Sequence, residues 1–280
     1  MCAASLCHAS EAIGMATVVE GDVALIRQTT RWILKPGVRL YASDLIETGP
    51  GATLTRIEMF RGVVADLGPQ SRVIVMPGLD KRRPAALYAI SGWLKLSSTP
   101  GKDAPTVVLS TEFLELMNIP GSVVLHLNGK NAEVFAESGT ATVAERRRDP
   151  TTAPIVLKAG SFFARTGNEK ALVTPRPPAS FIQGVPRSFL DPAPLLTPVF
   201  SARPEPVLKT LGDLTYAQAT PWLGAESAVG VFLVTQWKTG LNKDLRSGLA
   251  DNIKRHPEWR RVLFPEKNRF APAASSPKVW

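Results

Sequence analysis

The side chains that most often carry catalysis are few in this 280-residue chain and form no recognisable constellation. Both cysteines, Cys2 and Cys7, lie within the first seven residues, and two of the three histidines, His126 and His256, stand alone in the body of the chain. Because the body has no cysteine, these isolated histidines are unsuited to a zinc site. We expect His126 at the edge of the core or on the surface, and His256 at a helix stop, since Pro257 follows it.

Carboxylates could still act as an acid–base pair, as they do in glycoside hydrolases. Glu112 and Glu115 are three positions apart, so in a strand their side chains point to opposite faces. Glu133 and Glu137 are likewise expected at exposed strand positions. The sequence also contains no Gly-x-Ser-x-Gly elbow, His-Glu-x-x-His pair or Gly-Lys-Ser/Thr phosphate loop. We therefore predict a non-enzymatic protein and assign no catalytic, cofactor-binding or metal-ligating residue and no cofactor.

The elements that must position any binding residue are short strands. From Ala16 to about Val173, runs of Val, Ile, Leu and Thr alternate with turn-forming residues, and the chain holds 24 Pro and 21 Gly. Two apolar runs around Gly21-Asp22 predict a hairpin over residues 17–27. Further strands are expected at 54–62, 72–76, 86–96, 106–109, 122–127, 132–135, 141–144 and 155–157. The pattern predicts a mainly β fold, a compact multi-strand sandwich or barrel-like domain with a small helical C-terminal part.

A proline-rich segment follows this β region. Nine prolines fall between Pro175 and Pro206, and each fixes its own φ and biases the preceding residue toward extended conformations. We expect a stiff segment that straps across the β domain through apolar anchors. Those anchors are Phe181, Ile182, Phe189, Leu190, Leu195, Leu196 and Phe200.

Beyond the strap the hydrophobic period becomes helical. One apolar stripe, with a spacing of four residues, predicts a helix that ends before His256-Pro257. A second helix is expected to start after Thr220-Pro221, because Thr suits the N-cap and Pro the first helical position. The stripe is Leu241, Leu245, Leu249 and Ile253, and the residues expected to pack this piece are Trp222, Trp237 and Trp259.

The two ends of the chain have different compositions. The opening MCAASLCHASEAIG is small and apolar, resembling the end of a signal peptide whose start lies upstream, with a frayed cytoplasmic N-terminus as the alternative. Together with the cysteine-free body, this pattern predicts a periplasmic location. The predicted organisation is a signal-peptide remnant at 1–12, a β domain at 16–173, a proline-rich strap at 174–206, a helical region at 207–270 and a disordered tail at 271–280.

The formal charge of +9 is carried partly by short basic clusters. A net positive charge favours binding to an acidic envelope polymer, anionic lipid or nucleic acid. The alternative is that the basic residues only form a solvated surface. No basic motif interleaved with aromatics occurs, so we predict no nucleic-acid partner. No stretch approaches the roughly 20 apolar residues of a membrane-spanning helix. The clusters are Lys81-Arg82-Arg83, Arg146-Arg147-Arg148 and Lys254-Arg255.

The β region resembles FecR domains, which are periplasmic modules of Gram-negative bacteria. The similarity rests on an early strand carrying Arg27, followed by a turn with the pattern Ser-Asp-x-Ile-x-Thr-Gly that starts at Ser43, where the family usually has Gly. Asp44 is placed to accept backbone hydrogen bonds in this turn, and Ile46 to enter the core. The other matching segments are Gly21-Asp22-Val23, Gly51-Ala52, Phe60-Arg61-Gly62, Leu67-Gly68-Pro69-Gln70-Ser71, Ser91-Gly92-Trp93-Leu94 and Gly121-Ser122.

The resemblance implies a periplasmic β module that contacts another envelope protein, without the anti-sigma region or membrane helix of the best-known FecR proteins. We therefore predict protein–protein interaction or signalling in the cell envelope. The alternative is a module that binds carbohydrate such as peptidoglycan, or another acidic envelope polymer. Sugar binding needs an aromatic platform beside polar groups. The candidates in the β region are Trp32, Tyr41, Tyr88 and Trp93.

Overall fold

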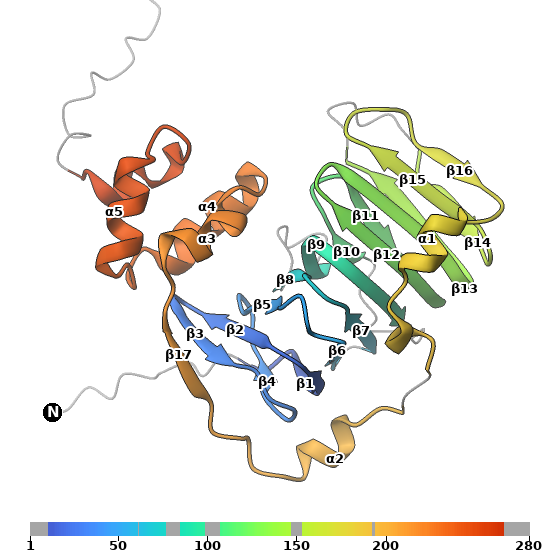
Figure 1. The fold of residues 1–280 in the computed structure, drawn as a ribbon, viewed down its shortest axis with the longest axis horizontal. Coiled ribbons are helices and arrows are strands. Elements are labelled where there is room, and N and C mark those ends of the chain that lie inside the picture. The colour runs from blue at the N-terminus through green and yellow to red at the C-terminus, as the bar shows by residue number, and fades with distance from the viewer. Residues whose placement is uncertain are drawn as a thin grey trace, which may run out of the picture. The chain divides into compact units, whose positions relative to one another are not determined.

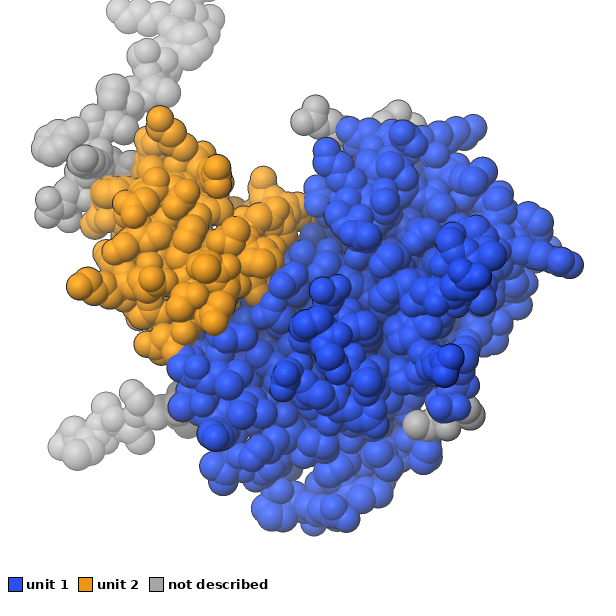
Figure 2. All heavy atoms as spheres, viewed as in Figure 1, with its two compact units in different colours: residues 1–212 blue, residues 213–280 orange. Residues whose placement is uncertain are grey.

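The computed structural model describes residues 11–60, 62–76, 85–98, 107–146, 153–191 and 194–265. It divides into two compact units, residues 1–212 and 213–280 (Figures 1 and 2). The protein is mainly β with a few C-terminal helices, as predicted. Most of the predicted signal-peptide remnant, the predicted tail, and the basic residues at 81–83 and 147–148 lie outside the described residues.

The first unit consists of two β-sheets that share two strands, β9 (Ala85–Ser98) and β13 (Asn131–Glu145) (Figure 1). β9 and β10 pair in parallel, and the strand pairs within residues 14–174 are otherwise antiparallel. Sheet A runs in the order β4 (Arg39–Leu40), β1 (Gly14–Glu20), β6 (Leu54–Met59), β7 (Val63–Leu67), β9, β12 (Gly121–Asn128), β13, β15 (Phe162–Thr166) and β16 (Leu172–Thr174). Sheet B runs in the order β17 (Lys209–Asp213), β3 (Thr30–Ile33), β2 (Val23–Arg27), β5 (Leu45–Thr48), β8 (Arg72–Val75), β9, β10 (Val107–Ser110), β11 (Leu114–Met117), β13 and β14 (Ile155–Lys158).

The inward faces of both sheets meet in one hydrophobic core. Alternate residues of each strand enter it, which is the two-residue period that the sequence shows. Ile46, which was expected in the core, is fully buried there. Representative members are Ala16, Ile57, Leu94, Val123 and Val134 from sheet A, and Leu25, Val73, Leu109, Leu116 and Val143 from sheet B.

The shared strand β9 changes sheets at Gly92. Leu87 and Ala89 face the core before this point and Leu94 and Leu96 after it, so the inward side chains switch from odd to even positions. The switch requires an irregular residue, and Gly92 has a φ of +100°. A β-carbon at Gly92 would also collide with the backbone of the segment that precedes β8.

The second shared strand, β13, bends in the same way at Gly139, where φ is +66°. Residues before the bend pair with β12 and β15 in sheet A, and residues after it pair with β11 and β14 in sheet B. A β-carbon at Gly139 would meet the carbonyl oxygen of Pro120. Strands that switch sheets at such bends form the corners of a sandwich.

The predicted hairpin over residues 17–27 is wrong. β1 pairs with β4 and β6 in sheet A, whereas β2 pairs with β3 and β5 in sheet B. Gly21, with a φ of +92°, turns the chain from one sheet to the other. The two apolar runs therefore lie in different sheets, because a turn pair fixes a reversal of direction but not the partner of each strand.

The proline-rich strap covers part of the outer face of sheet A. It contains α1 (Ala179–Gly184), the 3₁₀ turn η1 (Arg187–Phe189) and α2 (Thr197–Ser201). Phe181 and Phe189 are buried against outward-facing Leu54, Val124 and Phe162. Lys95 Nζ donates a 2.7 Å hydrogen bond to the carbonyl of Phe189. Of the other expected anchors, Leu196 and Phe200 are half-buried, while Ile182, Leu190 and Leu195 are exposed.

The second unit is built from α3 (Tyr216–Leu223), α4 (Ser227–Trp237), α5 (Lys243–Asp251), the 3₁₀ turn η2 (Pro257–Trp259) and α6 (Arg260–Leu263). Two members of the predicted stripe, Leu245 and Leu249, are fully buried on α5, whereas Leu241 and Ile253 lie outside the helix and are half-buried. Trp222, Trp237 and Trp259 are fully buried, as expected of the residues that pack this piece. Among the described residues, no helix is long and apolar enough to cross a membrane.

The predicted helix start after Thr220-Pro221 is wrong, since both residues lie inside α3. The helix begins earlier, where Thr215 and Gln218 form a capping box. Gln218 N donates to Thr215 Oγ1 at 3.3 Å, and Thr215 N donates to Gln218 Oε1 at 3.1 Å. A Thr-x-x-Gln sequence is the pattern that forms such a box.

The bend at Gly92 yields a prediction about stability. We expect Gly92→Ala to lower the free energy of unfolding by about 3 kcal/mol or more, because backbone strain of about 1–3 kcal/mol adds to overpacking of a tight corner. Urea denaturation followed by circular dichroism measures the change.

The control is Gly129→Ala, at a glycine with a φ of +57° and no atom near its would-be β-carbon. Gly129→Ala should lower the free energy of unfolding by only the strain of a left-handed backbone, roughly 1–2 kcal/mol. Equal effects of the two substitutions would contradict the role of Gly92 as a packed corner.

Candidate functional site

Several of the residues considered for catalysis are occupied by structural contacts. His126, half-buried on the outer face of sheet A, stacks on Trp93 with ring centroids 4.0 Å apart, and its Nδ1 lies 2.9 Å from Glu133 Oε2. Glu137 forms an ion pair with Lys95 at 2.7 Å. Glu112 is exposed in a bend. These contacts bring no nucleophile and base together.

His256 lies in the second unit, where it is buried directly before η2. Its Nε2 lies 3.0 Å from the hydroxyl oxygen of Tyr216. Burial lowers the pKa of His256, since it disfavours the charged imidazolium. The prediction that His256 stands at a helix stop is wrong, because α5 ends at Asp251 and is capped by Asn252.

The residues that carry the FecR resemblance hold the sandwich together. Asp44 accepts hydrogen bonds from Arg27 Nε and Nη2, both at 2.8 Å, and from the backbone N–H of Tyr41 at 2.8 Å. The last of these confirms the expected role of Asp44 in its turn. Ser43, where the family usually has Gly, adopts a φ of +79°. The turn therefore keeps its left-handed backbone without glycine.

A second group of these residues ties β5 to the corner at Gly92. Thr48 Oγ1 donates to the carbonyl of Gly68 at 2.7 Å and accepts from the N–H of Ser71 at 2.8 Å. Ser71 Oγ in turn donates to the carbonyl oxygens of Gly68 and Trp93, at 3.0 and 2.9 Å. All four residues belong to the segments that resemble FecR domains. Their contacts hold strands of the fold together.

The four candidate aromatics divide into two pairs. Tyr88 is fully buried, and Trp93 lies beneath the strap, with its ring centroid 5.2 Å from that of Phe181. Trp32 and Tyr41 are half-buried and line the same pocket. The structure thus brings together two of the aromatics that the sequence singled out.

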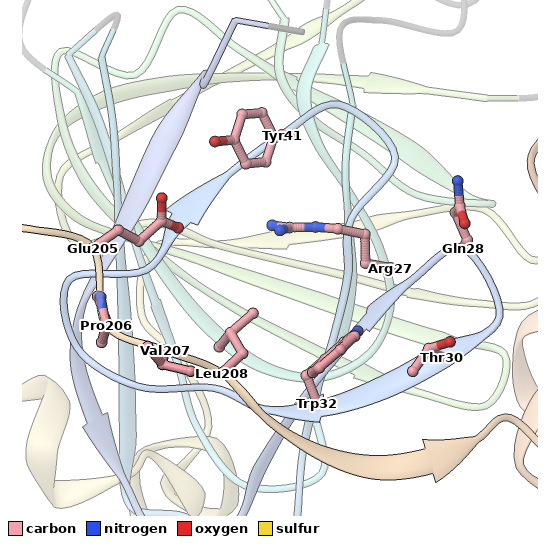
Figure 3. A pocket seen from close by; sticks show the side chains of 9 residues that line it. All are labelled: Arg27, Gln28, Thr30, Trp32, Tyr41, Glu205, Pro206, Val207 and Leu208. Atoms are coloured by element: carbon pink, nitrogen blue, oxygen red, sulfur yellow. The ribbon is translucent and has the colours of Figure 1, made fainter. Parts of the chain in front are cut away.

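This pocket, the candidate site, has a volume of about 660 Å³ and lies within the first unit (Figure 3). The β2–β3 hairpin forms one wall, and the turn after β4 contributes Tyr41. Residues 205–208, where the strap ends and the chain continues toward β17, form the opposite wall, which we call the strap wall. The lining residues of the pocket are Arg27, Gln28, Thr30, Trp32, Tyr41, Glu205, Pro206, Val207 and Leu208. Sequence reasoning missed Glu205 and the strap wall, since these are distant in the chain from the hairpin.

Arg27 is the central polar group of the pocket. In Figure 3 its guanidinium extends toward Glu205 and Tyr41, and it lies 4.8 Å from the centroid of the Tyr41 ring. The hydrogen bond to Asp44 raises the pKa of Arg27 further, against the opposing effect of burial, and Tyr41 and Glu205 add smaller favourable contributions. The side chain is therefore a fixed cation whose orientation is set by Asp44.

Hydrogen bonds and a strand pairing hold residues 205–208 in place. Arg39 N donates to Glu205 Oε1 at 3.0 Å, and Lys35 Nζ donates to the carbonyl of Val207 at 3.3 Å. Downstream, β17 joins the edge of sheet B beside β3. These contacts hold residues 205–208 against the hairpin.

Upstream of the wall, Glu58 clamps the start of α2. Its carboxylate accepts hydrogen bonds from the N–H groups of Leu196 and Thr197, both at 2.9 Å, and from the hydroxyls of Thr197 and Thr17, at 2.6 and 2.8 Å. Although burial alone would raise the pKa of Glu58, these four hydrogen bonds lower it below its ordinary value. The charged carboxylate satisfies donors that the start of a helix leaves unpaired.

The site offers binding groups but no metal centre. Across the described ranges, no group of three or more His, Cys, Asp or Glu side chains is placed to hold a metal ion. The pocket combines one cation, one carboxylate, two aromatic rings and small polar groups. Such a lining orients a ligand by hydrogen bonds and ring contacts.

Comparisons with known proteins place the chain in no family. No protein-family model matches it, and no curated protein matches it. Two solved structures of a "putative anti-sigma factor" from Parabacteroides distasonis are similar to it, each with 12% identity, over 50% of this chain, at a TM-score of 0.41. The matched region spans 65% and 64% of those chains. At so low a TM-score and identity, the likeness supports no statement about function.

The Glu58 clamp yields a prediction that involves pH. We expect Glu58→Gln to lower the free energy of unfolding at neutral pH by about 1.5–3 kcal/mol, the usual worth of a hydrogen bond to a charged group. Because the folded-state pKa of Glu58 is depressed, its contribution is present above the unfolded pKa and is lost as pH falls through the folded pKa. Urea denaturation at several pH values should show the variant and the parent converging in acid.

Glu20→Gln is the matched control, because exposed Glu20 accepts a hydrogen bond from the hydroxyl of Thr53 on the surface. It should change stability by less than about 1 kcal/mol. A difference between Glu58→Gln and the parent that did not depend on pH would argue against a charged clamp.

Proposed function

We propose that this protein is a non-enzymatic, FecR-like protein of the bacterial periplasm that works by binding another envelope protein. The observation that carries the proposal is an apolar surface on the strap. Eleven large hydrophobic side chains are exposed among the described residues, and six of them lie between residues 182 and 211. Exposed apolar side chains that follow one segment are candidates for contact with a partner.

Four of these six lie outside the pocket and before β17, and we call them the strap surface. They are Ile182, Leu190, Leu195 and Val199, with exposed fractions of 49, 66, 61 and 45%. Phe181 and Phe189, directly before Ile182 and Leu190, are buried in the sheet. The buried anchors fix the backbone, so the neighbouring side chains are presented to solvent without the freedom to collapse. Pre-ordered apolar groups bind a protein partner at a lower entropic cost.

The periplasmic location is part of the proposal and is supported by the sequence. The opening residues resemble the end of a signal peptide, and the body of the chain contains no cysteine. The FecR resemblance points to the same compartment. The strap surface and the compartment together favour a partner exposed to the periplasm.

The test is site-specific photocrosslinking in cells that export the full chain behind a working signal peptide. With the photoreactive group in place of Ile182, a third member of the strap surface, we expect a discrete crosslinked partner. The double substitution Leu190→Ser and Leu195→Ser should lower the yield by about tenfold or more, since burying one leucine is worth about 1.5–3 kcal/mol.

Val156→Ser is the matched control, because Val156 on β14 is as exposed as these leucines, at 63%, and lies on the edge of sheet B. It should leave the crosslink unchanged. A crosslink that survives the double substitution, or recovery of the protein on sedimented peptidoglycan with no protein crosslink, would overturn the proposal.

A further inference from the structure

We propose that the pocket formed by the β2–β3 hairpin and residues 205–208 binds a neutral saccharide. The proposal does not depend on the strap surface and concerns a separate site. A volume of about 660 Å³ lies within the 300–1,000 Å³ range typical of small-molecule pockets. It can accept short stretches of a glycan as well as a single sugar.

The two aromatic side chains supply the apolar part of such a site. Trp32 packs on the rim of the core and Tyr41 over Arg27, so each ring is held in place while remaining half-exposed. Val207 and Leu208 add aliphatic surface on the opposite wall. A pyranose ring has faces of C–H groups and a rim of hydroxyls, which suits rigid rings beside polar groups.

The polar groups offer both donors and acceptors. Arg27 uses Nε and Nη2 toward Asp44 and the carbonyl of Arg39, and within the described residues its Nη1 meets no hydrogen-bond partner. Glu205 accepts from Arg39 N through Oε1, and its Oε2 accepts from none of the described residues. A hydroxyl both donates and accepts, so neighbouring hydroxyls of one sugar can satisfy Arg27 and Glu205 together. Gln28 and Thr30, which also line the pocket, can each donate and accept further hydrogen bonds.

The charges of the pocket favour a neutral ligand over an ion. Glu205 faces the same space as Arg27 (Figure 3) and would repel a phosphate or a carboxylate. Arg27, fixed as a cation, would repel a positively charged ligand in turn. The Asp44 carboxylate is already engaged by Arg27 and by the N–H of Tyr41. The lining therefore argues against an acidic polymer at this site, although the whole chain is basic.

The test is titration of the full chain with defined tetrasaccharides, followed by calorimetry and by tryptophan fluorescence. The neutral probes are the β-1,4-linked tetramer of N-acetylglucosamine and maltotetraose, and the acidic probe is tetragalacturonate. We expect saturable binding of at least one neutral probe and weaker binding of the acidic one. Glu205→Gln and Trp32→Leu should each weaken that binding by about tenfold, the effect of about 1.4 kcal/mol.

Trp93→Leu is the matched control, because Trp93 lies in the same domain, beneath the strap and outside the pocket. It should leave the affinity unchanged, and circular dichroism shows whether each variant is folded. Failure of both neutral probes to bind at millimolar concentration, binding that both pocket variants retain, or a preference for tetragalacturonate would each overturn the proposal. The strap-surface substitutions should not alter sugar binding, so this test and the crosslinking test fail independently.

Discussion

The architecture of the first unit depends on two strands that each belong to two sheets. β9 and β13 carry the chain across the corners of the sandwich, and the inward side chains change parity at the bends. Only a residue without a β-carbon fits these points, since a left-handed backbone coincides with close contact to another chain segment at Gly92 and Gly139. Through these strands the early strands β1–β8 and the later strands β10–β16 share one core.

The Thr48–Ser71 hydrogen bonds explain why several polar residues are buried at one of these corners. Ser71 is completely buried, and its hydroxyl bridges the carbonyl oxygens of Gly68 and Trp93. The bend at Gly92 interrupts the ladder, and side-chain hydroxyls satisfy the carbonyls there. Four residues in the segments that resemble FecR domains, Thr48, Gly68, Ser71 and Trp93, are thus required by this corner.

The strap links the outer face of sheet A to the pocket. Leu54, Val124 and Phe162 give that face an apolar patch, which Phe181 and Phe189 cover. Once the strap lies there, Glu58 fixes the start of α2, and the chain continues to β17 past the β2–β3 hairpin. One covering segment thereby produces both surfaces with binding potential, the strap surface and the wall of the pocket.

The described residues gather binding groups at one place, the pocket beside the β2–β3 hairpin. Several histidines and carboxylates considered from the sequence take part in ring stacking, ion pairs and hydrogen bonds. In contrast, the pocket holds an oriented cation, a carboxylate and two rings around open space (Figure 3). Groups that are fixed before a ligand arrives bind it at a lower entropic cost.

The sequence by itself determined the mainly β class, the helical stripe at Leu245 and Leu249, and most strand positions, because local period and turn composition carry that information. It could not predict which strands pair. The pair Gly21-Asp22 indicated a turn correctly, but only the tertiary structure placed β1 and β2 in different sheets. The pocket depended on the same kind of information: Trp32 and Tyr41 were visible as candidates, whereas Glu205, more than 160 positions further along the chain, joins them only when the strap crosses the sheet. Contacts between residues so distant in sequence depend on how whole elements pack, which no local pattern records.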